Sequence, residues 1–354
     1  MLRTGTVLRS RYKIVQAIGQ GGMGAVYEAQ DAVLAGRTCA IKEVRLDADM
    51  TLEARRQAQE QFYREASVLA RLDHPTLPKV SDYFSEADLD YLVMDYVPGR
   101  DLKDIMNEAR RAGMFLDESD VLNWTAQLCD ALIYLHSQDP AILHRDIKPS
   151  NIKLTPDGRI KLVDFGLVKV LADDDSNRTL TVVQGRGTAA FTPLEQYGGD
   201  TGGTDIRSDI YSLGATVYNL LTNQPPLDAR RRFLNPGALQ IPHAVNPEIS
   251  STTERAVLAA LAMHPDQRPS SVAEFRAMLV PSGAVPSPAA YDPIASLHPA
   301  VVEGWPRAMR RNRGLIAAVA GLIALAIFVT IAVAPLEPPT ATATPAPTPT
   351  AATR

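Results

Sequence analysis

The chain has 354 residues, of which 45% are hydrophobic and 21% are charged, enough for one large globular domain or two smaller ones. Its formal net charge of -4 at pH 7 lacks the basic excess that nucleic-acid binding usually requires, so we expect no nucleic-acid partner. Cys39 and Cys129 lie in apolar runs without metal or redox spacing, which favours two reduced core residues. No sustained apolar stretch begins the chain, so we expect no secretory signal peptide.

A glycine-rich motif, GxGxxGxV, runs over residues 19–26. Glycines let the backbone approach phosphate oxygens without obstruction by Cβ, and Val26 can lie over a base. Alone, the motif fits a ligand-free hairpin turn or a dinucleotide-binding fold equally well. The next residues alternate as in a strand and lead to the apolar run 39–42, which ends in Lys42, instead of opening a helix. This order argues against the dinucleotide fold.

Residues 50–72 have helical periodicity and carry two acidic candidates, Glu60 and Glu65. A lysine at the end of a buried strand needs an acidic partner that fixes its position. The partner of Lys42 must come from the helix face that packs on the sheet, which favours Glu65. Glu60 remains the alternative. A position on a solvated helix face, with no role in the site, would also account for either residue.

The strongest local pattern is LHRDIKPSN over residues 143–151, followed by KLVDFG over residues 161–166. Phosphoryl transfer requires an acceptor for the hydroxyl proton, oxygen ligands for Mg²⁺ and positive charge near the transferred phosphate. One triplet alone is uninformative. Both triplets in this order, downstream of the glycine loop and Lys42, predict a phosphotransfer site.

Four side chains of this pattern match the three chemical requirements. Asp146 is the predicted proton acceptor. Asn151 and Asp164 are the predicted metal ligands, because hard cations take carboxylate and amide oxygens. Lys148 supplies the positive charge near the phosphate.

The ordered motifs resemble those of bacterial Hanks-type, receptor-like serine/threonine protein kinases, from about residue 12 to residue 279. The resemblance implies an α+β, bilobal protein kinase fold, with a β-rich N-lobe and hinge over residues 12–97 and a mostly helical C-lobe over residues 98–279. It implies catalytic roles for Asp146, Lys148 and Lys42. Lys148 occupies a position that tyrosine kinases usually fill otherwise, so specificity for serine and threonine is favoured.

The expected cofactors are ATP and Mg²⁺, with Mn²⁺ as a possible substitute. The resemblance implies a nucleotide site built from the glycine loop, the lysine strand, the glutamate helix and the hinge strand. Its expected residues are Ile18, Gly19, Gly21, Gly24, Val26, Ala40, Lys42, Glu65, Met94, Asp95 and Val97. The hinge part would offer backbone hydrogen bonds to adenine, although an ordinary core strand also fits its composition.

Further matches follow in the predicted C-lobe. Asp209 would brace the backbone of the catalytic loop, and Arg268 would form a buried structural pair with Glu195. The polar stretch after Asp164 corresponds to the activation loop of the family, where Thr179 and Thr181 are the expected phosphosites. A phosphate there would pair with Arg145; ordinary loop threonines are the alternative.

One departure from the family pattern is Pro193-Leu194-Glu195, where relatives usually read Ala-Pro-Glu or Ser-Pro-Glu. The glutamate is kept, so we expect the fold to be preserved. The shifted proline changes the surface that docks the substrate peptide, near Thr188. Two other functions are alternatives. One is a scaffold without catalysis, which usually lacks a catalytic residue that this chain retains. The other is a small-molecule kinase, which should lack the pair of Glu195 and Arg268.

An uncharged apolar run of about the length that crosses a bilayer extends over residues 314–334. It shows no polar face, which favours a single membrane span over a buried helix. An arginine cluster precedes it, so the positive-inside rule predicts a kinase domain in the cytoplasm that acts on cytoplasmic proteins, in a single-pass protein of the cell membrane. Small residues at four-residue spacing in the run are a weak indication of a homodimer.

The remaining segments have simple compositions. Residues 1–11 are expected to be an N-terminal extension, and residues 280–313 a Pro/Ala-rich juxtamembrane linker that ends in the arginine cluster. Residues 335–354 are rich in Pro, Thr and Ala, which predicts a short extracytoplasmic tail without a folded sensor.

Overall fold

The chain divides into two units, Met1–Ala300 and Val301–Arg354, and the computed structural model describes residues of the first unit only. The described residues are 1–21, 24–45, 50–87, 89–164, 169–170, 189–197, 204–279 and 297–299. Among them, no helix is both long enough and apolar enough to cross a bilayer. The predicted span at residues 314–334 and the tail after it lie outside the described residues.

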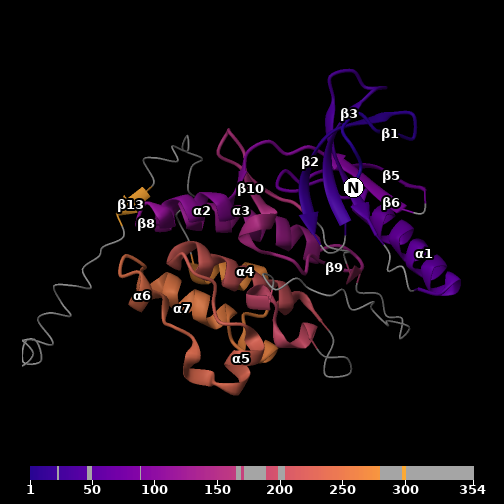
Figure 1. Cartoon of the computed structure of the whole chain (residues 1–354). Helices are drawn as coiled ribbons and strands as arrows, with labels where there is room; N and C mark the ends of the chain where they lie inside the picture. The colour runs from indigo at the N-terminus through magenta and orange to yellow at the C-terminus, as the bar shows by residue number, and fades with distance from the viewer. Residues whose placement is uncertain are drawn as a thin grey trace, which may run out of the picture. The chain divides into compact units, whose positions relative to one another are not determined.

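The N-terminal part is a six-stranded antiparallel sheet with the strand order β1-β2-β3-β4-β6-β5 (Figure 1). The strands are β1 (Val7–Leu8), β2 (Tyr12–Gly21), β3 (Gly24–Asp31), β4 (Thr38–Val44), β5 (Val80–Glu86) and β6 (Leu89–Asp95). Buried residues alternate with more accessible ones along β3, as expected for a strand with one face in the core. Helix α1 (Leu52–Leu69) contacts β5 and β6, and it begins at the N-cap Thr51.

Part of the predicted N-terminal extension belongs to this sheet. Val7 and Leu8 pair with Lys13 and Tyr12 of β2, and Leu8 is buried. The amide of Gly5 also donates to the carbonyl of Ile14, at 2.8 Å. A two-residue strand is too short to show periodicity in the sequence.

The C-terminal part is mainly helical. Its α-helices are α2 (Leu102–Arg111), α3 (Glu118–His136), α4 (Ile206–Thr222), α5 (Ala229–Leu234), α6 (Pro242–Val245), α7 (Ser251–Ala260) and α8 (Val272–Leu279). Every residue of α4 from Ser208 to Thr222 is buried, so this helix forms the centre of the C-terminal core. A Cβ at Gly214 would lie 2.6 Å from that of Ala260, so close packing of α4 against α7 requires glycine there.

Short strands place the loop that carries the catalytic motif. Strand β9 (Ile142–Leu143) precedes this loop and pairs with β12 (Lys169–Val170). The 3₁₀ helix η1 (Pro149–Asn151) ends the loop, and β10 (Ile152–Leu154) follows and pairs with β11 (Ile160–Leu162) and β7 (Arg100–Asp101). A third pair joins β8 (Met114–Leu116) to β13 (Leu297–Pro299), which Figure 1 shows beside α2. The described part thus has the predicted β-rich and helical halves.

Candidate active site

The carboxylate of Asp146 lies in the loop between β9 and β10, where two neighbouring side chains orient it. Lys148 Nζ lies 2.9 Å and 2.7 Å from its two oxygens. Asn151 Nδ2 donates to Asp146 Oδ2 and to the backbone carbonyl of Asp146, each at 2.9 Å. The sequence predicted all three residues, and the fold brings them into direct contact. An oriented carboxylate beside a cation is suited to accept a proton from a hydroxyl group.

The buried carboxylate of Asp209, in the first turn of α4, fixes the backbone of this loop. Its Oδ2 accepts the N–H of His144 at 2.9 Å, and its Oδ1 accepts the N–H of Arg145 at 2.8 Å. Arg145 has a φ of 67°, a left-handed conformation that is unusual for a non-glycine residue. These two bonds help to hold that conformation, as the sequence predicted for Asp209.

Lys42 on β4 forms an ion pair with Asp164, which follows β11. Burial alone would raise the pKa of Asp164, but the charges of Lys42 and Lys148 hold this pKa below its usual range. The carboxylate is therefore ionised at neutral pH. Asp164 and Asn151 offer carboxylate and amide oxygens, the donor types that Mg²⁺ takes in proteins, so these residues fit the expected metal.

The hairpin of β2 and β3 carries the glycine motif. Gly21 pairs with Gly24 across the hairpin, and residues 22–23 lie outside the described part. Gly24 has a φ of 142°, and a Cβ there would lie 1.9 Å from the carbonyl oxygen of Glu43 on β4. The close approach of β4 therefore requires glycine at position 24, apart from any requirement for phosphate binding. Ile18 is 41% exposed on this hairpin, and Val26 pairs with Lys42 on β4.

The predicted adenine residues come together on the central strands. Ala40 on β4 lies opposite Met94 on β6, and both are buried, as is Val97 after β6. The N–H of Asp95 donates to the carbonyl of Lys79 at 3.0 Å. Of the hinge residues proposed from sequence, Asp95 therefore does not offer its N–H to a nucleotide.

The family described as the protein kinase domain matches residues 12–278. The chain belongs to the protein kinase family. The kinase domain is of the bacterial serine/threonine kind, as its relatives indicate.

A probable serine/threonine-protein kinase of Streptomyces coelicolor is 36% identical over 284 residues, which cover 76% of this chain and 39% of that protein. The serine/threonine-protein kinase PknB of Mycolicibacterium smegmatis is 35% identical over 294 residues, or 77% of this chain and 43% of PknB. The chain thus spans about two fifths of the length of these relatives. A crystal structure of the Mycobacterium tuberculosis PknI kinase domain matches with a TM-score of 0.61 and 29% identity, over 79% of this chain and 98% of that one.

Glu65 lies on α1 of the kinase domain, on the buried face that the sequence predicted, but it does not contact Lys42. Its Oε1 accepts a hydrogen bond from Gln61 Nε2 at 2.7 Å, and its Oε2 is buried without a partner among the described residues. Burial raises the pKa of Glu65, although the charges of Arg145 and Arg64 oppose this shift. The predicted pair of Lys42 and Glu65 is not formed in this structure, in which Lys42 pairs with Asp164.

The buried pair of Arg268 and Glu195 is formed as predicted. Arg268 Nη1 lies 2.6 Å from Glu195 Oε1, and Nη2 lies 3.1 Å from Oε2. Ser208 Oγ also donates to Glu195, at 2.8 Å. Pro193-Leu194-Glu195 therefore keeps the glutamate in place despite its shifted proline. Thr179, Thr181 and Thr188, the other residues named for this segment, lie outside the described residues.

One residue near the catalytic loop, His136 at the end of α3, was not predicted from the sequence. Its Nε2 lies 3.0 Å from Asp209 Oδ2. The sequence does indicate a buried position for His136, because this residue follows Leu128 and Leu132 at four-residue spacing on the buried face of α3. A polar side chain at such a position needs a buried partner.

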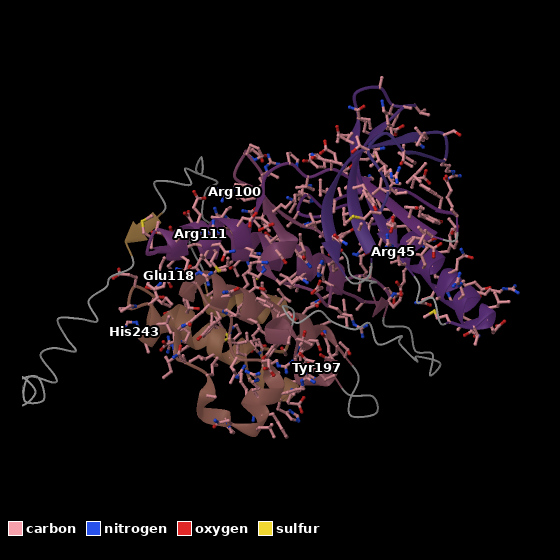
Figure 2. All side chains as sticks on the ribbon, viewed as in Figure 1. Arg45, Arg100, Arg111, Glu118, Tyr197 and His243 are labelled. Carbon is pink, nitrogen blue, oxygen red and sulfur yellow. The ribbon has the colours of Figure 1, made fainter. Side chains whose placement is uncertain are left out.

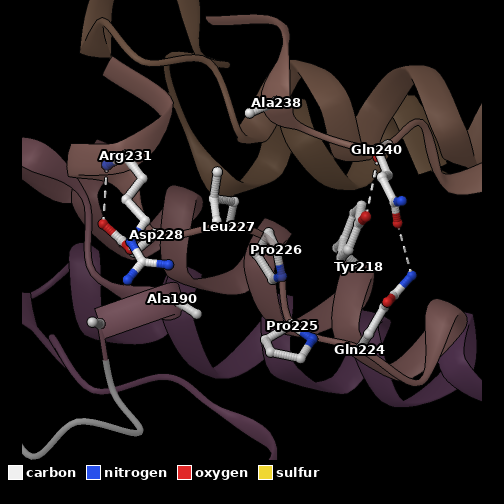
Figure 3. A pocket seen from close by; sticks show the side chains of 11 residues that line it. Ala190, Tyr218, Gln224, Pro225, Pro226, Leu227, Asp228, Arg231, Ala238 and Gln240 are labelled. Atoms are coloured by element: carbon white, nitrogen blue, oxygen red, sulfur yellow. Dashed lines mark hydrogen bonds and ion pairs between the residues drawn. The ribbon is translucent and has the colours of Figure 1, made fainter. Parts of the chain in front are cut away.

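A pocket of about 500 Å³, whose lining includes none of these catalytic residues, lies between α4, α5 and the described residues 189–190 (Figure 3). Ala189 and Ala190 line one side of it, and the pair of Asp228 and Arg231 lines another. Tyr197, which Figure 2 labels just after the 3₁₀ helix η3 (Leu194–Gln196), has the guanidinium of Arg230 4.3 Å above its ring.

Proposed function

We propose that this chain is an ATP-dependent serine/threonine protein kinase that transfers the γ-phosphoryl group of MgATP to hydroxyl groups of cytoplasmic proteins and of its own activation loop. The observation that carries this proposal is the contact of Asp146 with both Lys148 and Asn151. A scaffold protein without catalysis has no need to orient a carboxylate in this way. The ion pair of Lys42 with Asp164 adds the groups required on the nucleotide side.

Each charged residue has a defined task in the proposed reaction. Asp146 accepts the proton of the attacking hydroxyl, while Lys148 stays beside the charge of the transferred group. When ATP binds, Lys42 leaves Asp164 and pairs with the nucleotide phosphates. Asp164 and Asn151 would hold a magnesium ion, which would supply charge neutralisation at the phosphates.

Protein acceptors are favoured over small molecules by the segment that ends the activation loop. Glu195 and Arg268 anchor this segment on the C-terminal core. Ala189 and Ala190 of the same segment line the pocket. We propose that a bound polypeptide acceptor extends over this surface. We propose Thr179 and Thr181 as sites of autophosphorylation, with Arg145 as the partner of the added phosphate.

We further propose that the kinase is a single-pass protein of the cell membrane. The support is the apolar run at residues 314–334 and the arginines before it, which favour a cytoplasmic kinase domain, a lipid bilayer as partner and close approach of two copies. Extraction tests this proposal: the full chain should stay with membranes in alkaline carbonate, and a chain that ends at residue 300 should be released. Release of both would contradict it.

Labelling with ATP tests the catalytic proposal. The full chain in detergent, incubated with Mg²⁺ and labelled ATP, should phosphorylate itself, mainly on Thr179 and Thr181 by peptide mass spectrometry. A Lys42→Met variant should carry no label, and EDTA should abolish labelling of the parent. ATP binding by the parent without any labelling would instead support a scaffold.

A further inference from the structure

A short segment that follows the kinase domain in the sequence lies on that domain as a strand. Strand β13 pairs antiparallel with β8, and Figure 1 shows the two strands beside α2. The opposite positions are Leu297 and Leu116, His298 and Phe115, and Pro299 and Met114. The protein kinase family matches residues 12–278, so β13 lies beyond the part of the chain that the family accounts for.

The register and a proline identify the residues of β13 and β8 that exchange backbone hydrogen bonds. In an antiparallel pair, positions that exchange both bonds alternate with positions that exchange none. Pro299 has no N–H group, so it belongs at a non-exchanging position. The exchanging pair is therefore His298 and Phe115, in the middle of the short sheet.

A separate contact of β8 agrees with this assignment. At a non-exchanging position, the N–H and C=O groups of Met114 point away from β13 and need another partner. The carbonyl of Met114 accepts a hydrogen bond from Asn223 Nδ2 at 2.7 Å. Asn223 is buried at the C-cap of α4, and Leu116 is buried as well. One edge of β8 is thus fixed to the C-terminal core, and β13 covers the opposite edge.

We propose that β13 is a docking strand, which anchors the linker of this chain to the edge of β8 by strand addition. Without it, this edge of β8 would present unpaired backbone groups to other chains. In the single-pass protein proposed above, the anchor shortens the tether. Residues 300–313 can span at most about 50 Å, against about 120 Å for residues 280–313. This tether length rests on the proposed membrane location, whereas the strand pairing does not.

Paired cysteines in the full chain test the register. Met114→Cys with Pro299→Cys places two thiols at opposite positions, where the Cα atoms lie about 4.5 Å apart, within the range of a disulfide. Met114→Cys with Leu297→Cys is the matched control, because these diagonal positions lie about 8 Å apart, too far to be bridged. Burial raises the pKa of Cys39 to about 11 and that of Cys129 to about 12, so neither natural thiol competes.

The rate of disulfide formation with oxidised glutathione distinguishes a docked linker from an undocked one. We expect the opposite pair to form a disulfide within one chain at least about tenfold faster than the diagonal pair, as measured by peptide mass spectrometry. Equal rates in the two pairs would indicate a linker without fixed register. A disulfide between two copies would indicate a strand exchanged between chains. Either result overturns the proposal.

Hydrogen exchange in the full chain gives a second readout. His298→Pro removes the N–H that pairs with Phe115, so the amide of Phe115 should exchange at least about tenfold faster than in the parent. His298→Ala keeps this N–H and should leave the exchange rate unchanged. An unchanged amide of Phe115 in His298→Pro would overturn the docking strand. Neither readout needs phosphate transfer or a membrane, so a parent that lacks kinase activity or membrane retention would refute the proposed function alone.

Discussion

Lys42 on β4 forms its ion pair with Asp164 after β11, while Glu65 on α1 lies buried with Gln61 as its hydrogen-bond partner. The lysine that is expected to hold nucleotide phosphates thus neutralises the carboxylate that is expected to hold the metal. MgATP would separate the two groups by giving each one a partner of opposite charge. We therefore expect substitutions of Asp164 and of Glu65 to have different effects.

Asp164→Asn removes the proposed metal carboxylate and the partner of Lys42. We expect the rate of phosphate transfer to fall about 100-fold or more, because charge stabilisation of the transferring group is lost. Binding of ATP without Mg²⁺ should be retained, as measured by fluorescence of a labelled nucleotide. Asp157→Asn, on an exposed turn, is the control and should transfer phosphate at the parental rate. Parental activity in Asp164→Asn would exclude it as a metal ligand.

Glu65→Gln tests how much the buried charge of Glu65 destabilises the fold. Since burial raises the pKa of Glu65, this carboxyl group stabilises the fold when protonated, and the contribution is lost as pH rises through the raised pKa. The neutral amide should therefore raise the melting temperature at pH 7 by about 1–3 °C, with a smaller gain at pH 4. Glu60→Gln, on the exposed face of α1, should show no such gain. A lower melting temperature at pH 7 in Glu65→Gln would contradict this account.

Arg268→Met breaks the buried pair with Glu195 and leaves a carboxylate without its cation. Arg268 is 0% exposed, so we expect a loss of about 3–5 kcal/mol in the free energy of unfolding. The double variant Arg268→Met, Glu195→Met should recover part of this loss, because no unpaired charge remains. Urea denaturation of the three proteins measures both effects, and a double variant less stable than the single one would argue against the buried pair.

The pH dependence of the same pair has a defined sign. Burial alone would raise the pKa of Glu195, but Arg268 holds it below its usual range. The stabilisation is therefore present above the unfolded pKa of a glutamate and is lost as pH falls through the lowered pKa. The stability difference between the parent and the double variant should shrink in acid. A difference that grows in acid would contradict this sign.

Ala238→Trp places a large side chain in the pocket that Ala190 also lines. If protein substrates extend over this surface, KM for a protein acceptor should rise several-fold while KM for ATP stays constant. Ala112→Trp, at an exposed position after α2, is the matched control and should change neither value. An unchanged KM for several protein acceptors would place their binding elsewhere.

The sequence predicted those contacts of the catalytic site that lie within one short loop. Asp146, Lys148 and Asn151 lie within six residues of one another, so one short loop fixes their contacts. Lys42 and Asp164 are 122 residues apart, and their meeting required the fold of both parts of the chain. The buried face of α1 followed from periodicity, but the partner of Glu65 depends on how α1 is placed on the sheet, which periodicity does not determine.

The most direct test of the kinase assignment compares the parent with Asp146→Asn, both as the full chain. We predict that the parent labels serine and threonine residues of an added protein acceptor, identified by phosphoamino-acid analysis. Asp146→Asn should bind ATP with parental affinity and label the acceptor at least about 100-fold more slowly, because its amide cannot accept the hydroxyl proton. Equal labelling by the two proteins, or ATP binding without labelling by the parent, would contradict the central claim.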